Sequence, residues 1–244
     1  MSTPHIVDYS ADVPMKGRLF MPDADARKPG CILMISEAPG PGENVTSRAA
    51  RLQERGHGVF LADFHGGGEV LEDHTEIMAR LTALREQPDV PLNRGMAALE
   101  TLQSIPELAG EPVIAAGYCF GGTIALDMGR YGAQLAAIAG FHSGLTPLGG
   151  VTSVADWKAT GVLACIGADD PTISASERAA FEMEMLDRGG EWTLQVYGGV
   201  IHAFTDRNIE RIGMPDFARY DRWADEQSWC AFLQLIDHAS QVQE

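Results

Sequence analysis

Residues 113–123 read VIAAGYCFGGT, and this stretch decides the fold. Its first residues are β-branched or small, as in a short buried strand, and the residues after Cys119 have the apolar spacing of an amphipathic helix. Glycines before and after Cys119 allow a strand and a helix to approach closely around a strained central residue. The segment therefore predicts a strand, a tight turn that raises Cys119, and a helix, although most free cysteines are buried core residues.

Apolar runs alternate with helical patterns along the rest of the chain. Besides the strand before Cys119, we expect strands at residues 5–9, 15–20, 31–36, 58–63, 135–141, 161–167 and 191–197. Helices are expected at residues 45–55, 70–85, 92–105 and 221–239, directly after Cys119, and up to about residue 188. Nearly continuous apolar strands joined by helices are typical of a parallel sheet covered on both faces. We expect one α/β domain over residues 1–244, with about seven or eight strands, a mostly parallel sheet and no large lid domain.

The composition argues against several classes of protein. The net charge is -16 at pH 7, which does not suit a nucleic-acid partner or an anionic membrane. The four cysteines have no CxxC pair and no metal-type spacing, and those other than Cys119 are expected to be buried thiols. The N-terminus has no signal-peptide pattern, and no apolar stretch is as long as a membrane span. We therefore expect a cytoplasmic protein without a metal or a membrane partner.

Polar residues follow three of the expected strands. In open α/β sheets the ligand site lies beyond the carboxyl ends of the strands, and Cys119, the pair Asp169 and Asp170, and His202 all come after strands. This is the chain order nucleophile, acid, base. His202 would activate the thiol, and one aspartate would orient its imidazole ring. The residues alone do not separate Asp169 from Asp170, because either could cap the following helix.

The loop after the third expected strand is predicted to face Cys119. There the backbone N–H groups of Ala38 and Phe120 are candidates for stabilising an oxyanion. Glu37 either accepts a hydrogen bond from the neutral thiol or is a solvated loop residue. His142 is expected to line the site or to bond locally. His65, in the HGGG turn, is given no oxyanion role because it follows a different strand.

Four of these features together resemble the dienelactone hydrolase family of α/β-hydrolases: Glu37 after the third strand, GYCFGG around Cys119, GADDPTI, and YGGVIHAFT. The resemblance extends from about Cys31 to the last helix. It implies the α/β-hydrolase fold and hydrolysis of esters or lactones through a thioester acyl-enzyme, without a metal or organic cofactor. It also implies that Cys119 is the nucleophile, Asp170 the acid and His202 the base.

The resemblance carries two further expectations. Glu37 matches the family glutamate that holds the resting thiol and takes part in its activation when substrate binds. Family members also bind a substrate carboxylate with arginines, and Arg80 and Arg207 lie near the corresponding places. The FHGGG turn and the loop of Ala38 differ from the degradative enzymes, so the resemblance does not fix the substrate.

The sequence thus predicts a cysteine-dependent hydrolase of small esters or lactones, active as a monomer or a homodimer. The alternative is a thiol-based binding or redox-sensing protein with little turnover, since accessible reactive cysteines are readily oxidised. A dinucleotide-binding oxidoreductase is excluded because no G-x-G-x-x-G follows the first strands.

Overall fold

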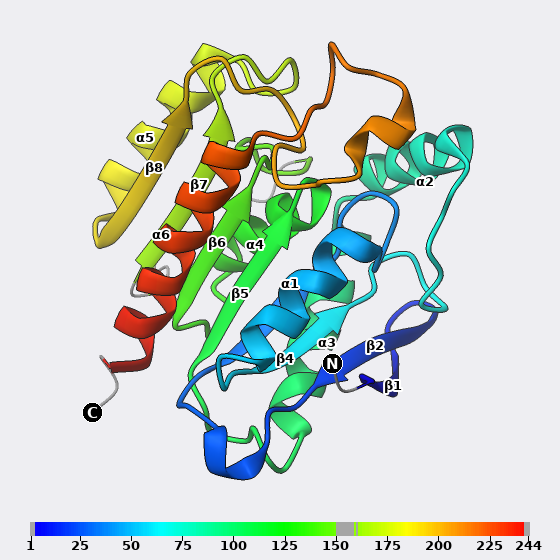
Figure 1. Cartoon of the computed structure of the whole chain (residues 1–244), viewed down its shortest axis with the longest axis vertical. Helices are drawn as coiled ribbons and strands as arrows, with labels where there is room; N and C mark the ends of the chain where they lie inside the picture. Colours follow the sequence, from blue (N-terminus) through cyan, green and yellow to red (C-terminus); the bar gives the residue numbers. More distant parts are fainter. Residues whose placement is uncertain (1–2, 150–158, 160, 242–244) are drawn as a thin grey trace.

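The computed structural model describes residues 3–149, 159 and 161–241 (Figure 1). Its centre is an eight-stranded sheet in the order β1-β2-β4-β3-β5-β6-β7-β8. The strands are β1 (His5–Ser10), β2 (Pro14–Phe20), β3 (Cys31–Ile35), β4 (Gly58–Ala62), β5 (Val113–Tyr118), β6 (Ala137–Phe141), β7 (Gly161–Gly167) and β8 (Glu191–Tyr197). Strands β3 to β8 are parallel, whereas β1 and β2 pair antiparallel with their neighbours. The predicted α/β fold with a mostly parallel sheet is confirmed.

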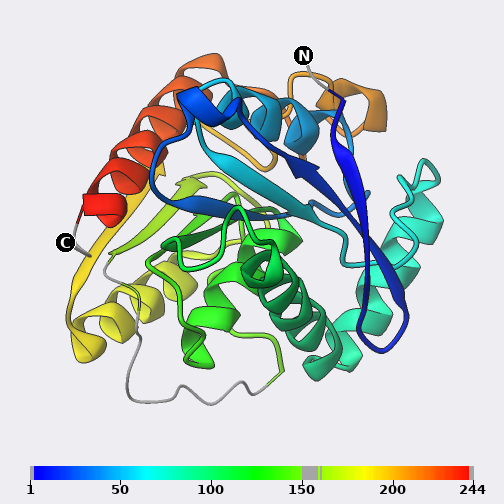
Figure 2. The same cartoon turned by 90° about the horizontal axis from the view of Figure 1, so that it is seen from below.

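Helices cover both faces of this sheet (Figure 2). One face carries α1 (Glu43–Gln53) and α6 (Arg222–Gln241), and the other carries α3 (Asp89–Ser104), α4 (Phe120–Arg130) and α5 (Ala175–Arg188). The strands supply apolar side chains to both layers: in β3, Leu33 packs in the core with α3 and α4, and Ile32 packs with α1 and α6. In the described part of the chain, no helix combines the length and apolar character needed to cross a membrane.

Helices α1 and α6 begin within two residues of their predicted starts, whereas α2 (His74–Glu86) and α3 differ by more. Helix α2 starts four residues later than the predicted residue 70, because the Asp73 side chain caps it by accepting from the Glu76 N–H. Helix α3 starts at Asp89 instead of Leu92. Its Pro91 lies in the first turn, where a helical N–H has no intrahelical acceptor, so the missing donor does not stop the helix.

The register of the parallel strands gathers their carboxyl ends at one edge of the sheet. Tyr118 pairs with Phe141, and Gly167 pairs with Tyr197, so the residues that follow β5, β6, β7 and β8 emerge side by side. In Figure 1 this edge is at the top, below α2 and the segment 198–221. The described residues place no large lid domain there.

Helix α4 approaches the sheet most closely at its first turn, where glycines leave the two backbones in contact. A Cβ atom on Gly121 would lie 2.2 Å from the carbonyl oxygen of Ser36 and 2.6 Å from that of Ile35. A Cβ atom on Gly117 would lie 2.2 Å from the Gly121 carbonyl oxygen. The start of α4 is therefore pressed onto β3 and β5 without room for a side chain, which fixes the turn between Gly117 and Gly121.

This close approach predicts that Gly121→Ala is strongly destabilising. The added methyl group meets backbone atoms that cannot rotate away, so we expect a loss of about 3 kcal/mol in the free energy of unfolding, measured by urea titration. Gly198→Ala is the control, because its Cβ would meet no atom within 4 Å. Equal urea midpoints for the two variants would contradict the proposed packing constraint.

Candidate active site

Cys119 occupies a strained turn between β5 and α4. Its backbone has φ 52° and ψ -122°, a region that residues with a Cβ rarely adopt and that costs about 1–3 kcal/mol. The Cys119 N–H donates to the Phe141 carbonyl oxygen at 2.9 Å, and α4 begins at the next residue. The surrounding packing thus holds the thiol at the carboxyl edge of the sheet, over the positive end of the α4 dipole.

The structure brings His202 and Asp170 to this thiol. His202 Nε2 lies 3.1 Å from Cys119 Sγ, and His202 Nδ1 donates to Asp170 Oδ2 at 2.8 Å. The second oxygen of Asp170 accepts from the backbone N–H and the hydroxyl of Thr172, at 2.9 and 2.7 Å. Asp169 is exposed, so the geometry separates the two aspartates and favours Asp170, the one that the family resemblance indicated.

The electrostatic environment of His202, between Cys119 and Asp170, favours its charged imidazolium form. Burial acts to lower the pKa of His202, but the charge of Cys119 and the hydrogen bond to Asp170 outweigh it and raise the pKa to about 10. Burial acts to raise the pKa of Asp170, but hydrogen bonds from His202 and Thr172 outweigh it and hold this pKa below its ordinary value. The arrangement therefore favours an imidazolium at His202 beside an ionised Asp170.

Ala38 and Phe120 lie beside Cys119 in the wall of one cavity. Phe120 is the first residue of α4, where the backbone N–H has no acceptor within the helix. The Ala38 N–H has no backbone acceptor among the described residues. The Ala38 carbonyl oxygen is held from behind by His65, whose Nε2 lies 2.7 Å away.

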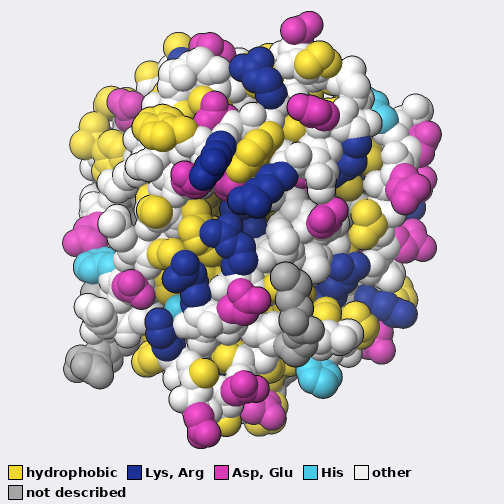
Figure 3. Space-filling view, in the orientation of Figure 1, with side chains coloured by type: hydrophobic (Ala, Val, Ile, Leu, Met, Phe, Trp, Pro, Cys, Tyr) yellow, Lys and Arg dark blue, Asp and Glu magenta, His cyan; other side chains and the backbone are white. Residues whose placement is uncertain are grey.

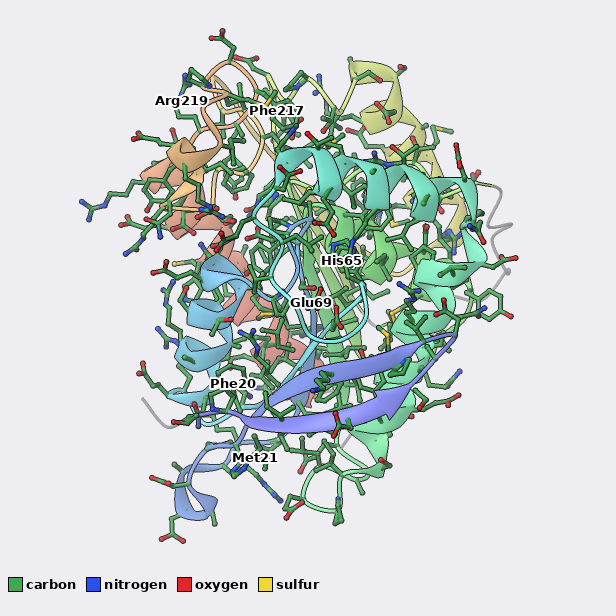
Figure 4. The ribbon with its side chains drawn as sticks, turned by 90° about the vertical axis from the view of Figure 1, so that its right-hand side faces the viewer. Phe20, Met21, His65, Glu69, Phe217 and Arg219 are labelled. Carbon is green, nitrogen blue, oxygen red and sulfur yellow. The ribbon has the colours of Figure 1, made fainter. Side chains whose placement is uncertain are left out.

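The HGGG turn thus supports the loop of Ala38 from outside the cavity. The Asp63 carboxylate organises the turn by accepting the N–H groups of His65, Gly66 and Gly68 at 2.8, 3.0 and 2.8 Å. Burial lowers the pKa of His65, so its ring is neutral and its Nε2–H can donate to Ala38. Figure 4 shows His65 on the loop below α2. The sequence excluded an oxyanion role for His65 but gave no sign of this support.

A cavity of about 540 Å³ opens above Cys119. One wall is the inner face of α2, and the other is the segment 203–218 that follows His202. Figure 4 shows Phe217 on the side of this segment toward α2 and Arg219 on its outer side. The apolar lining residues of the two walls are Ile77, Met78, Leu81, Ile209, Ile212 and Phe217. The cavity therefore suits a substrate with an apolar body. The described residues contain no cluster of three or more metal-ligating side chains.

Glu37 lines this cavity but does not hold the thiol. Its Oε2 accepts from Asn44 Nδ2 at 3.0 Å, whereas the hydrogen-bond partner of Cys119 Sγ is His202. This differs from the expectation that Glu37 binds the resting thiol. Burial and the Asp206 carboxylate raise the pKa of Glu37 to about 7, against the hydrogen bond from Asn44. Near neutral pH, Glu37 is therefore present in both the charged and the neutral form.

His142 directly follows β6 and lies beside His202 at the carboxyl edge of the sheet. Its ring centroid is 5.2 Å from that of His202, and its Nε2 lies 2.8 Å from the Thr205 hydroxyl oxygen. Burial, with the charge of His202 next, lowers the pKa of His142 well below its ordinary value. His142 is therefore a neutral neighbour of the charged pair.

The two arginines expected near the substrate lie outside the cavity. Arg80 is held on the outer side of α2 by Glu76 at 2.7 Å and Glu69 at 3.8 Å. The Arg207 guanidinium lies 5.9 Å from the centre of the Tyr220 ring. Figure 3 shows that Lys and Arg side chains form a band across the face of α1 and α6, despite the negative net charge. Neither Arg80 nor Arg207 is among the lining residues of the cavity.

Two other arginines line the cavity. Arg211 lines the cavity and pairs with Asp206 at 2.8 Å. Arg85 also lines it, with its guanidinium 5.6 Å from the centre of the Phe120 ring, and forms no ion pair with a carboxylate of the described residues. The helical spacing of Ile77, Leu81 and Arg85 is the sequence signal that would have placed Arg85 on the inner face of α2.

The remaining cysteines divide into two kinds. Cys31 and Cys165 are buried, and burial raises the pKa of each to about 12. Cys230 is exposed, so the expectation that it is buried is wrong. On α6 the buried face holds Trp229, Phe232 and Ile236, and Cys230 falls outside it.

Brief iodoacetamide treatment at neutral pH should therefore label Cys119 first. Only Cys119 has an imidazole within contact distance to take its proton, and the thiolate is the reactive form. Cys230 should react more slowly, and Cys31 and Cys165 only after unfolding. Peptide mapping over time gives the order, and labelling of Cys230 ahead of Cys119 would contradict this view of the site.

Comparisons with known proteins show which family and fold this chain shares. The model of the dienelactone hydrolase family matches residues 15–240. A dienelactone hydrolase-like promiscuous phosphotriesterase, P91 from metagenomic libraries, is 31% identical with a TM-score of 0.88, covering 97% of this chain and 98% of its own. The dienelactone hydrolase of Anabaena variabilis shares the fold at 18% identity and a TM-score of 0.62, covering 93% of this chain and 96% of its own.

Among curated sequences, the uncharacterized protein K02A2.1 of Caenorhabditis elegans is 32% identical over 145 residues, which are 59% of this chain and 90% of that protein. The family and the shared fold support a hydrolytic activity. Because the family model covers nearly the whole chain, the protein belongs to the dienelactone hydrolase family.

Proposed function

We propose that the protein hydrolyses carboxylic esters or lactones with Cys119 as its nucleophile. The observation that carries this proposal is the 3.1 Å contact between Cys119 Sγ and His202 Nε2 on a strained turn, with Asp170 bonded to the other ring nitrogen. A thiol placed against an oriented imidazole can be activated without any other base.

In the proposed reaction, His202 takes the thiol proton and the thiolate attacks the acyl carbon. The N–H groups of Ala38 and Phe120 stabilise the oxyanion of the tetrahedral intermediate. The intermediate expels the alcohol oxygen, which takes the proton from His202, and a thioester on Cys119 remains. His202 then deprotonates a water molecule that attacks the thioester, and the acid and the free thiol are released. Asp170 keeps the imidazole oriented throughout.

The cavity suggests what the substrate looks like. Its two apolar walls favour an uncharged, apolar acyl or alcohol group, and Arg85 in the lining offers a cation to a carboxylate. Glu37 and Asp206 are acidic residues in the same lining, and Asp206 is paired with Arg211. We therefore propose esters or lactones of small apolar acids as substrates, with any carboxylate directed toward Arg85.

A substrate panel tests this function. It contains p-nitrophenyl acetate and butyrate, a series of lactones, dienelactone, and a p-nitrophenyl phosphotriester, which is included because P91 is described as a phosphotriesterase. We expect turnover of esters or lactones that Cys119→Ala abolishes and Cys230→Ala leaves unchanged. Rapid alkylation of Cys119 without turnover of any panel member would instead support a thiol-based binding or redox-sensing protein.

The two adjacent aspartates provide a matched test of the acid. Asp170→Asn should lower kcat/KM on the order of 10²–10⁴-fold, because an amide favours the wrong tautomer of His202. Asp169→Asn should change kcat/KM far less, since Asp169 is exposed. Circular dichroism would verify that both variants are folded, and equal losses in the two variants would contradict the role of Asp170.

A further inference from the structure

Asn44, in the first turn of α1, has only one possible amide orientation. Its Oδ1 accepts from Arg48 Nε at 3.1 Å. An arginine side chain has donors and no acceptor, so the oxygen of the amide must face it. The NH2 group of Asn44 is therefore turned the other way, toward Glu37 and the segment after His202.

Both protons of this NH2 group are used. Asn44 Nδ2 donates to Glu37 Oε2 at 3.0 Å and to Thr205 Oγ1 at 3.3 Å. Thr205 Oγ1 also lies 2.8 Å from His142 Nε2. The Asn44 amide thus links Arg48 to Glu37 and to Thr205, and Thr205 in turn contacts His142.

Arg48 anchors the hydrogen bonds of the Asn44 amide. It is buried, and its Nη2 donates to Asp225 Oδ1 at 2.6 Å and to the Thr205 carbonyl oxygen at 2.7 Å. Asp225 lies on α6 and Thr205 three residues after His202, so the arginine ties two helices to the loop that carries His202. A buried ion pair of this kind is costly to break, which keeps the Asn44 amide in place.

The charges that face Glu37 come from several elements. Asp206 raises its pKa together with burial, and Arg211 and Arg48 act in the opposite direction beside Asn44. Cys119 and His202 line the same cavity. Asn44 is a neutral group that bonds Glu37 directly, and its hydrogen bond ties the Glu37 carboxylate to α1.

We propose that Asn44 is a positioning residue that holds the Glu37 carboxylate toward α1 and away from the Cys119 thiol in the substrate-free site. Arg48 sets the orientation of the Asn44 amide, which also bonds Thr205 beside His142. The role in catalysis rests on the proposed function, but the position of Glu37 does not. Without the Asn44 donor, Glu37 binds a proton more readily and is released toward Cys119.

The first test is a carboxyl 13C NMR titration of Glu37, assigned by comparison with Glu37→Gln. Asn44→Asp keeps an acceptor for Arg48 but removes the donor to Glu37, and Asn44→Leu removes both. A hydrogen bond to the charged form lowers the pKa of a carboxyl group, so its loss should raise the Glu37 midpoint from about 7 by about one pH unit in both variants. Asn44→Asp also adds a nearby negative charge, which acts in the same direction.

Ser47→Ala is the matched control. Ser47 is on the same helix and donates to the Asn44 carbonyl oxygen at 2.8 Å, but it does not bond Glu37. Its Glu37 midpoint should equal that of the wild type. A midpoint in Asn44→Asp within about 0.3 pH units of the wild type would overturn the proposal, and this one variant suffices if Asn44→Leu does not fold.

The second test asks whether Asn44 acts through Glu37. The rate of Cys119 alkylation by iodoacetamide is measured from pH 5 to 9, where a charged Glu37 near the thiol should slow the reaction by disfavouring the thiolate. In Asn44→Asp, the pH at which the alkylation rate changes should shift by the same amount as the Glu37 midpoint. In the Glu37→Gln background, Asn44→Leu should leave the profile unchanged; a shift that persists there would overturn the proposal. Neither readout requires ester turnover, so failure of the substrate panel would remain a separate result.

Discussion

The position of the Cys119 thiol depends on one backbone constraint, the contact between the start of α4 and the ends of β3 and β5. Gly117 and Gly121 let main chain meet main chain there, and the positive φ of Cys119 follows from that contact. The strain lies in the backbone dihedral angles of Cys119, and the Cys119 side chain lines the cavity. His202 and the Ala38 loop are built onto the same edge of the sheet, so a shift of α4 would move the thiol relative to both of them.

Much of this site could be predicted because its residues directly follow strands. Cys119, Asp170 and His202 are separated by many residues, yet parallel strands bring their carboxyl ends together whatever the length of the connections. Position after a strand did not separate Asp169 from Asp170; the family resemblance indicated Asp170, and the hydrogen bond to His202 agrees with it. For Arg80 and Arg85, a difference of five residues on a helix decides between the outer and inner faces, and the spacing from Ile77 and Leu81 carries that information.

Contacts between distant side chains could not be predicted from local patterns. Asn44 and Thr205 are 161 residues apart, and no local pattern links Asn44 to the YGGVIHAFT motif that contains Thr205. Their pairing depends on how α1 and the loop after His202 pack around Arg48. The exposure of Cys230 also depends on which face of α6 meets the sheet. Residues that support the site from behind are therefore its least predictable part.

The residues of the cavity walls are less constrained by the fold than Cys119 and its partners beneath them. Helix α2 and the segment 203–218 supply most of the apolar lining, but neither contributes a strand to the sheet. Side chains such as Met78 and Ile212 can change in size without disturbing the contact between α4 and the strands. Substrate range can thus diverge during evolution while the reacting groups stay fixed, which makes this scaffold suitable for directed selection of new acyl or alcohol specificities.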